Sequence, residues 1–287
     1  MRLEADGVHG VHLGQWTSQN GDHSQELEVV IGVLALQGAF AEHQDILQRL
    51  FVSSHFRSAT STAAHGQPLK FTSITVRTVE ELERCSALII PGGESTTIAL
   101  LLRLSNLLEP LQEFTLHKPI WGTCAGAILL STEVANPKKG GQEVLKRIGV
   151  RIERNGWGSQ VESFEAHMDV PMLRNPQRPF LGVFIRAPVV VSLLDAISFN
   201  LKAPQPLNHS STISPPPIEI VARLPEHLLP SQTCDSEDDH NAQSVVALRQ
   251  GRHFLTTFHP ELTDDDRFHD FFVRRCVLPS VLAQDHS

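Results

Sequence analysis

The hydrophobic pattern between residues 29 and 132 alternates between two kinds of segment. Short, uninterrupted apolar runs predict strands buried on both faces at 29–36, 87–90 and 118–121, and an alternating run predicts a strand at 71–77. Apolar residues at helical spacing predict helices at 39–51, 79–84, 94–108 and 127–132. Strands that alternate with helices in this way predict an α/β fold, in which helices flank both faces of a mostly parallel central sheet.

Strands dominate the pattern after residue 149. We expect them at 161–164, 180–185, 189–193, 218–223, 245–249 and 254–258, followed by a closing helix at 264–277. Polar segments interrupt this order. We expect a flexible extension at 1–28 and one domain over 29–280, with loop insertions on its surface near 53–68, 195–217 and 228–242. The last insertion carries an acidic run at 235–239.

Composition narrows the class of protein. The 287 residues are 41% hydrophobic and 20% charged, which is typical of a globular chain, and the net charge of −8 argues against a nucleic-acid partner. No apolar run reaches the roughly 18 residues of a membrane span, and no signal-peptide core precedes the first strand. The 4 cysteines are scattered and form no Cys-x-x-Cys pair. We therefore expect a cytoplasmic protein with reduced thiols and without a metal site or cofactor.

One cysteine has the surroundings of a nucleophile. Cys124 lies in Gly122-Thr-Cys-Ala-Gly126, between a short strand and an apolar helix. Glycines on both sides permit the sharp strand-to-helix turn known as a nucleophile elbow, with cysteine in place of serine. The start of the helix would favour the reactive thiolate, and the Ala125 N–H would point at a developing oxyanion. The alternative is a buried structural cysteine in a glycine-rich turn.

A histidine and a carboxylate follow the last predicted strand. His259 and Glu261 are two residues apart in His-Pro-Glu. If the strand continues, their side chains lie on one face, so Glu261 can bind one imidazole nitrogen and leave the other to accept a proton from Cys124. The sequence therefore predicts a Cys-His-Glu triad. The chain has 15 histidines, and most of them must have structural or surface roles.

A glycine-rich turn forms the third element. Pro91-Gly-Gly-Glu-Ser-Thr-Thr97 follows a predicted strand and opens a helix, so its backbone can approach a ligand closely. It lacks the lysine of a nucleotide-binding P-loop. The alternative is an ordinary strand-to-helix turn in which Ser95 caps the helix.

These three elements together resemble the class I (triad) glutamine amidotransferases. More narrowly, the chain resembles the glutaminase subunits of pyridoxal 5′-phosphate synthase, the Pdx2/PdxT/SNO family. The likeness extends from residue 29 to the closing helix. Beyond the elements above, the residues that carry it are Ile31-Gly-Val-Leu-Ala-Leu-Gln-Gly-Ala39, Glu42-His43, Glu153-Arg-Asn155, Val161-Glu-Ser-Phe-Glu-Ala166, Gly182-Val-Phe-Ile-Arg-Ala-Pro188 and Phe258-His-Pro-Glu-Leu262.

The resemblance implies a flavodoxin-like class I glutaminase fold and a role for each matching residue. Cys124 is the nucleophile, His259 the base and Glu261 its orienting carboxylate. The glutamine site is implied at Gly93, Glu94, Ser95, Arg154, Ile185 and Arg186, with Gln37 nearby and an oxyanion hole formed by the Gly93 and Ala125 amides. Either arginine could instead form surface salt bridges. The implied partner is a (β/α)₈-barrel synthase subunit in a hetero-oligomer, without which glutaminases of this family are nearly inactive.

Two other functions remain open at this point. A γ-glutamyl hydrolase would use similar residues on a similar sheet and would act without a partner. A catalytically idle regulatory subunit would have no need of an intact triad. The extension and the insertions depart from the compact family pattern and are similar to those of fungal members. They touch no motif residue, so they bear on docking rather than on the triad.

Overall fold

A seven-stranded sheet organises the fold. The computed structural model describes residues 26–60, 68–137, 141–157, 163–202, 215–229 and 241–284. The sheet order is β10 (Ile218–Arg223), β11 (Val245–Gln250), β12 (His253–Thr256), β4 (Ile120–Thr123), β3 (Ala87–Ile90), β1 (Leu27–Leu34) and β2 (Leu69–Val76). The five strands from β12 to β2 are parallel, and β11 is antiparallel to both of its neighbours. Their chain order across the sheet is 2-1-3-4-5, so the predicted flavodoxin-like α/β fold is confirmed.

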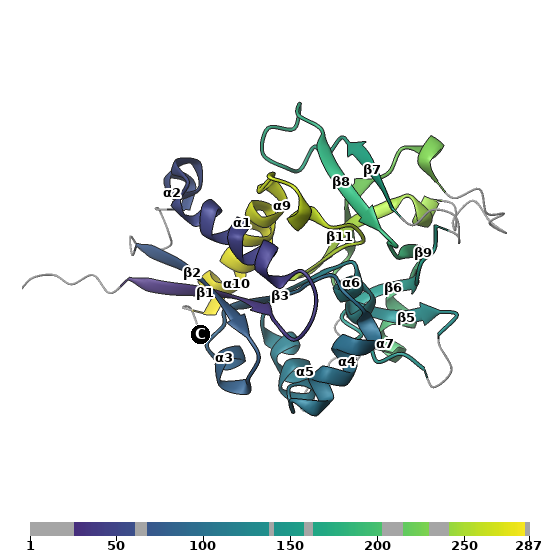
Figure 1. The fold of residues 1–287 in the computed structure, drawn as a ribbon, viewed down its shortest axis with the longest axis horizontal. Helices are drawn as coiled ribbons and strands as arrows, with labels where there is room; N and C mark the ends of the chain where they lie inside the picture. The colour runs from purple at the N-terminus through teal and green to yellow at the C-terminus, as the bar shows by residue number, and fades with distance from the viewer. Residues whose placement is uncertain are drawn as a thin grey trace, which may run out of the picture.

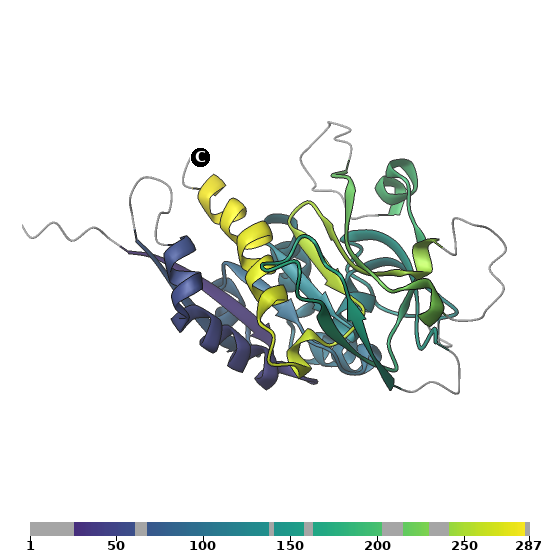
Figure 2. The same cartoon turned by 90° about the horizontal axis from the view of Figure 1, so that it is seen from above.

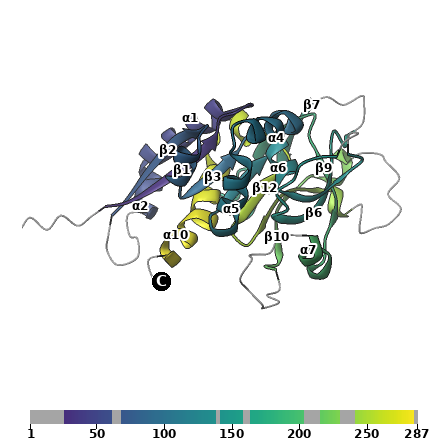
Figure 3. The same cartoon turned by 90° about the horizontal axis from the view of Figure 1, so that it is seen from below.

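Helices cover both faces of this sheet (Figures 1 and 3). One face carries α1 (Phe40–Val52), α2 (Ser54–Thr60) and α9 (Arg267–Phe272), the last continuing through a π-helical turn (Val273–Val277) into α10 (Leu278–Gln284). The other carries α3 (Val79–Glu83), α4 (Ser95–Leu104), α5 (Leu108–His117) and α6 (Ala125–Leu130). Strand β3 shows why both faces are covered: Ala87 and Ile89 join one core, whereas Leu88 and Ile90 join the other.

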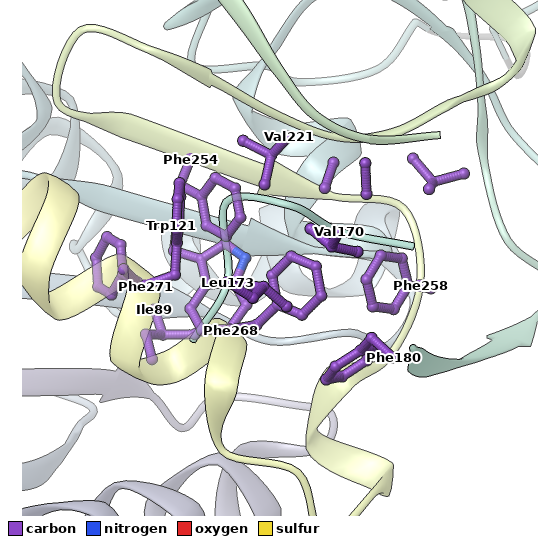
Figure 4. Close-up of a cluster of buried hydrophobic side chains, with 14 of the residues drawn as sticks. Ile89, Trp121, Val170, Leu173, Phe180, Val221, Phe254, Phe258, Phe268 and Phe271 are labelled. Carbon is purple, nitrogen blue, oxygen red and sulfur yellow. The ribbon is translucent and has the colours of Figure 1, made fainter. Parts of the chain in front are cut away.

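The core under α1 and α9 is aromatic (Figure 4). Trp121 of β4 and Phe254 of β12 lie 5.3 Å apart between ring centroids. Phe258, just after β12, is fully buried and its ring contacts Phe180 and Phe268. Because aromatic side chains bury large areas in specific geometries, this cluster anchors the chain immediately before His259.

A strand-rich region extends from one end of the sheet (Figures 1 and 2). Strands β5 (Ser131–Ala135), β6 (Ile148–Glu153) and β9 (Val189–Leu193) form a three-stranded sheet, and β7 (Ser163–Met168) pairs with β8 (Phe180–Ile185) in a hairpin. The sequence predicted β8 and β9, whereas the strand predicted at 161–164 overlaps β7 only at Ser163 and Phe164, and residues 161 and 162 lie outside the described ranges. It did not predict β5 or β6, which pair with each other, β6 pairing also with the distant β9.

Several predicted boundaries are wrong. The loop at 53–68 begins with helix α2, and residues 61–67 lie outside the described ranges. The single helix at 94–108 is two helices, because Asn106 turns the chain with a φ of 56°. The insertion at 195–217 begins with α7 (Ala196–Lys202). Most of the insertion at 228–242, including the acidic run, lies outside the described residues.

The ends of the domain also differ from the prediction. Strand β1 begins at Leu27, so the last two residues of the predicted extension belong to the sheet, while residues 1–25 lie outside the described ranges. The final helical segment continues through α10 to residue 284, beyond the predicted end at 277. None of the helices in the described ranges has the length and apolar character that a membrane crossing requires.

Candidate active site

The predicted site residues gather at one edge of the central sheet. Strands β1, β3, β4 and β12 are parallel neighbours, so the loops that follow them meet at their carboxyl ends. These loops carry Gln37, Gly93, Cys124 and His259, one after each strand in turn. Chain order reverses between β1 and β3, and such a switch point is where open α/β sheets form their binding crevices.

Cys124 adopts the strained backbone of an elbow. Its φ of 47° and ψ of −101° are unfavourable for a residue with a side chain, and it stands between β4 and α6. The flanking glycines make the turn possible: a Cβ at position 122 would overlap the Gly126 backbone, and a Cβ at 126 would overlap the Ile90 carbonyl. The Cys124 side chain is 6% exposed, and its Sγ lies 4.0 Å from the Ile185 carbonyl oxygen.

His259 and Glu261 are in contact, but not for the predicted reason. Strand β12 ends at Thr256, and His259 precedes a 3₁₀ turn at Pro260–Leu262. The alternation of a strand therefore does not apply, and the expectation of a continuing strand is wrong. The turn itself places His259 Nδ1 2.7 Å from Glu261 Oε1, while the His259 N–H donates to the Val183 carbonyl of β8. Glu261 is 4% exposed.

The charge state of His259 depends on both neighbours. Burial alone lowers the pKa of this imidazole, but hydrogen bonds with Cys124 and Glu261 and the negative charge on both partners raise it to about 10. Because Nδ1 faces Glu261, Nε2 is the nitrogen left for Cys124. The raised pKa favours the imidazolium form of His259, which can donate a proton to a leaving group beside Cys124.

The loop after β3 is fastened to the loop after β1. The Ala39 N–H donates to the Gly92 carbonyl at 3.1 Å, and the Glu94 N–H donates to Gln37 Oε1 at 2.9 Å. Gly92 cannot carry a side chain, since a Cβ there would overlap the His259 ring. Gln37, predicted as support for the site, thus holds the glycine loop directly.

A polar network extends from this loop toward β6. Arg154 Nη2 donates to Glu94 Oε1 at 2.5 Å, and Arg154 Nη1 donates to Gln142 Oε1 at 3.2 Å. Ser95 is not the helix cap, because Glu94 occupies that position; the Ser95 hydroxyl donates to Gln142 Oε1 at 3.4 Å. Gln142 was missed by the sequence analysis, since no local pattern connects it to the other three.

The remaining predicted residues surround Cys124 less tightly. Ala125 is the first residue of α6 and is 1% exposed. Ile185 ends β8 and is 40% exposed, an unusual value for an isoleucine next to a buried cysteine. Arg186 is exposed with a φ of 42°, and its side chain forms no hydrogen bond within the described part of the chain. It is therefore in place but not engaged.

Two buried histidines lie behind the triad. His43 of α1 and His269 of α9 are both 0% exposed. His43 Nε2 lies 3.4 Å from Glu261 Oε2, and His43 Nδ1 lies 2.8 Å from His269 Nε2. In the sequence, His43 was assigned no role beyond its place in the Glu42-His43 motif. A signal was present, because His43 stands on the apolar face of its helix with Ile46, Leu47 and Leu50.

The chain is similar to known proteins over most of its length. A sequence profile of the SNO glutamine amidotransferase family matches residues 33–206 and 216–278. The pyridoxal 5′-phosphate synthase subunit PdxT of Chloroflexus aurantiacus is 38% identical over 246 residues, covering 85% of this chain and 99% of that protein. The subunit SNO1 of the same synthase in Saccharomyces cerevisiae is 36% identical over 256 residues, covering 86% and 93%. A crystal structure of a glutamine amidotransferase superposes with a TM-score of 0.59 at 34% identity, covering 85% and 97%.

Proposed function

Because the chain belongs to the SNO glutamine amidotransferase family, we propose that it hydrolyses L-glutamine to L-glutamate and ammonia through Cys124, His259 and Glu261. The ammonia passes to a synthase subunit that forms pyridoxal 5′-phosphate. The observation that carries the proposal is that Cys124 and His259 both lie against Gly92 at the switch-point edge of the sheet, while Glu261 holds His259 through a hydrogen bond. The relatives named as subunits of pyridoxal 5′-phosphate synthase support the destination of the ammonia.

The first half of the reaction forms a thioester. The Cys124 thiolate attacks the side-chain carbonyl carbon of glutamine, and the carbonyl electrons move onto oxygen. The N–H groups of Gly93 and Ala125 stabilise that oxyanion, an interaction worth about 10²–10³ in rate for a single donor. The intermediate collapses with cleavage of the C–N bond, and the His259 imidazolium protonates the departing ammonia.

The second half releases glutamate. His259, now neutral, removes a proton from a water molecule that attacks the thioester carbon. The C–S bond breaks, glutamate leaves, and Cys124 and His259 return to their starting state. Glu261 holds His259 through Nδ1 in both halves, so that Nε2 faces the reacting atoms.

Substrate recognition is assigned to the polar network beside the elbow. Gly93, Glu94 and Ser95 line one side of the glutamine site, and Arg154, Ile185 and Arg186 line the other. A guanidinium suits the α-carboxylate of an amino acid because it can donate two parallel hydrogen bonds. Arg154 already pairs with Glu94, so glutamine would insert its two charged groups between opposite charges.

The proposed partner is the (β/α)₈-barrel synthase subunit, in a hetero-oligomer. We also propose a cytoplasmic location, because the three cysteines in the described ranges, Cys85, Cys124 and Cys276, are unpaired and buried.

The deciding experiment measures glutamate and ammonia release by the purified chain mixed with its cognate synthase. We expect the wild type to release both in equal amounts and the Cys124→Ala variant to release neither, while it still binds the synthase. The matched control is Cys276→Ala, which removes another buried thiol far from the elbow. Wild-type release by Cys124→Ala would contradict the triad, and rates independent of the synthase would favour a stand-alone γ-glutamyl hydrolase.

A further inference from the structure

A cluster of polar side chains lies on the side of Glu261 that faces away from His259. Its centre is His43, which is fully buried under α1. His43 Nε2 lies 3.4 Å from Glu261 Oε2 and 3.3 Å from the hydroxyl of Thr123, the residue before the nucleophile. His43 Nδ1 lies 2.8 Å from His269 Nε2. The cluster therefore contacts the triad carboxylate and the elbow strand together.

We infer that His43 is a positioning residue of the triad, which gives its Nε2–H to Glu261 Oε2 and so holds the carboxylate against His259. The inference rests on the proposed function for its consequence in catalysis. His43 acts through Glu261 and does not touch the reacting atoms.

The Glu261 carboxylate has a hydrogen-bond donor on one of its two oxygens. Glu261 Oε1 is occupied by His259, but Oε2 is buried and has no hydrogen-bond donor in the described part of the chain. A buried carboxylate oxygen without a donor is strongly destabilised, so such groups find partners in folded proteins. His43 Nε2 is within reach of Oε2, and a small ring rotation completes a bond shared with Thr123.

The protonation of the two buried histidines decides which ring nitrogens can donate. Burial lowers the pKa of His43 to about 3, against the opposing pull of Glu261, and burial with the nearby charge of Arg49 lowers that of His269 to about 3. Both rings are therefore neutral near pH 7, and each carries a single N–H.

Only one pair of tautomers satisfies the cluster. If His269 donates its Nε2–H to His43 Nδ1, then His43 carries its proton on Nε2, facing Glu261. The reverse pair would turn a bare nitrogen toward the carboxylate and leave an N–H at His269 Nδ1, which is buried without a partner. With both protons on Nε2, each N–H of His43 and His269 has an acceptor. Only the lone pair of His269 Nδ1 is then left without a donor among the described residues.

The same contacts show what surrounds His43. Glu261 and His259 face it from the turn after β12, and His269 faces it from α9. Thr123 and the edge-on ring of Trp121 face it from β4, the Trp121 ring at 5.5 Å between centroids. A role confined to packing would need the shape of the ring, whereas positioning needs a donor at Nε2. The two roles therefore predict different results for variants of similar polarity.

The test compares His43→Gln with His43→Asn in the complex with the synthase. A glutamine amide nitrogen stands close to the place of Nε2, whereas an asparagine nitrogen reaches only the place of Nδ1. We expect His43→Gln to retain most of kcat and His43→Asn to lose about 10–100-fold, as for a lost hydrogen bond to a charged group. The KM for glutamine should stay near the wild-type value in both, since neither touches substrate. Urea unfolding of both variants checks that their stabilities are similar.

A second measurement does not depend on activity. Nitrogen-15 spectra of histidine-labelled protein should show His43 protonated on Nε2 and bare on Nδ1 at pH 7. The opposite tautomer, or equal kcat in the two variants, would overturn the inference. A wild type that releases no glutamate would instead contradict the proposed function, and the tautomer would still decide whether His43 holds Glu261.

Discussion

Two polar networks meet at Cys124, and they differ in burial and in chemistry. Behind the nucleophile, Glu261 and His43 are fully buried side chains. In front of it, Arg154 and Glu94 form an ion pair whose side chains are 13% and 44% exposed. The rear network contains neutral histidines and one carboxylate, and the front network contains opposite charges that water can reach. Burial keeps the groups of the rear network in place, whereas the exposed groups of the front network are free to exchange partners.

Burial explains the difference. Inside the protein, electrostatic contacts are strong and a polar group without a hydrogen-bond partner costs much free energy. The rear network therefore has essentially one arrangement. Solvent weakens the front ion pair, and exposed pairs of this kind contribute only about 0–1 kcal/mol to stability. In the proposed site, glutamine would displace the ion pair between Arg154 and Glu94 at a small cost in free energy, whereas the buried contacts of Glu261 would stay in place.

The largest expected effect comes from the proposed triad, which shares Glu261 with the rear network. Cys124→Ala and His259→Ala should each lower kcat by about 10⁴–10⁶, because neither chemical step can proceed without them. Glu261→Ala should lower kcat less, because an orienting carboxylate acts through the histidine. Steady-state kinetics of the three variants with saturating synthase tests this ranking. A Glu261→Ala variant as inactive as Cys124→Ala would show that the carboxylate has a more direct role.

The second effect concerns the Gly92–Gly93 peptide, which could act as a hinge in the glycine loop. The Gly92 carbonyl accepts from Ala39, and turning the Gly92–Gly93 peptide would present or withdraw an oxyanion-hole N–H. If docking of the synthase favours the donor-in state, it must contact the two states differently. We expect the isolated chain to hydrolyse glutamine slowly and the mixture to be at least tens of times faster, up to the roughly 10²–10³ that one donor contributes. Equal kcat with and without synthase would contradict control of activity by the Gly92–Gly93 peptide.

A smaller effect is expected from the front network. Arg154→Lys keeps the positive charge but loses the planar donor pair, so the KM for glutamine should rise by about tenfold while kcat changes little. The matched control is Arg151→Lys, an exposed arginine three residues earlier on β6. If Arg154→Lys lowered kcat and left KM unchanged, Arg154 would act in the chemical steps rather than in substrate binding. The two networks would then not differ in role.

Features that depend on local sequence could be predicted, whereas features that depend on contacts between distant segments could not. Uninterrupted apolar runs ending in glycine turns predict the parallel strands and the elbow, because a strand buried on both faces leaves a plain signal. The break at Asn106 depends on a single left-handed residue, and β6 depends on pairing with the distant β9. His43 occupies a core position of α1, so its partner becomes visible only when α1 is packed against the turn after β12.

The smallest expected effect is on stability, and it tests whether His269 of the rear network is neutral in the folded chain. The pKa of His269 lies near 3 in the folded chain, lowered by burial, against an ordinary 6.5. Below pH 6.5 the unfolded chain therefore binds a proton that the folded chain does not, so the free energy of unfolding falls as pH falls toward 3. The slope for one such group approaches about 1.4 kcal/mol per pH unit.

Urea unfolding of wild type and His269→Asn between pH 7 and pH 5 measures this slope. We expect the variant to be less stable at pH 7, because it loses a donor to His43, but to lose less stability on acidification. His167→Asn is the control, since His167 is exposed on β7 and should leave the slope unchanged. Equal slopes for wild type and His269→Asn would mean that His269 takes up a proton while folded. The rear network would then carry a positive charge at mildly acidic pH, and burial alone would no longer distinguish it from the ion pair in front.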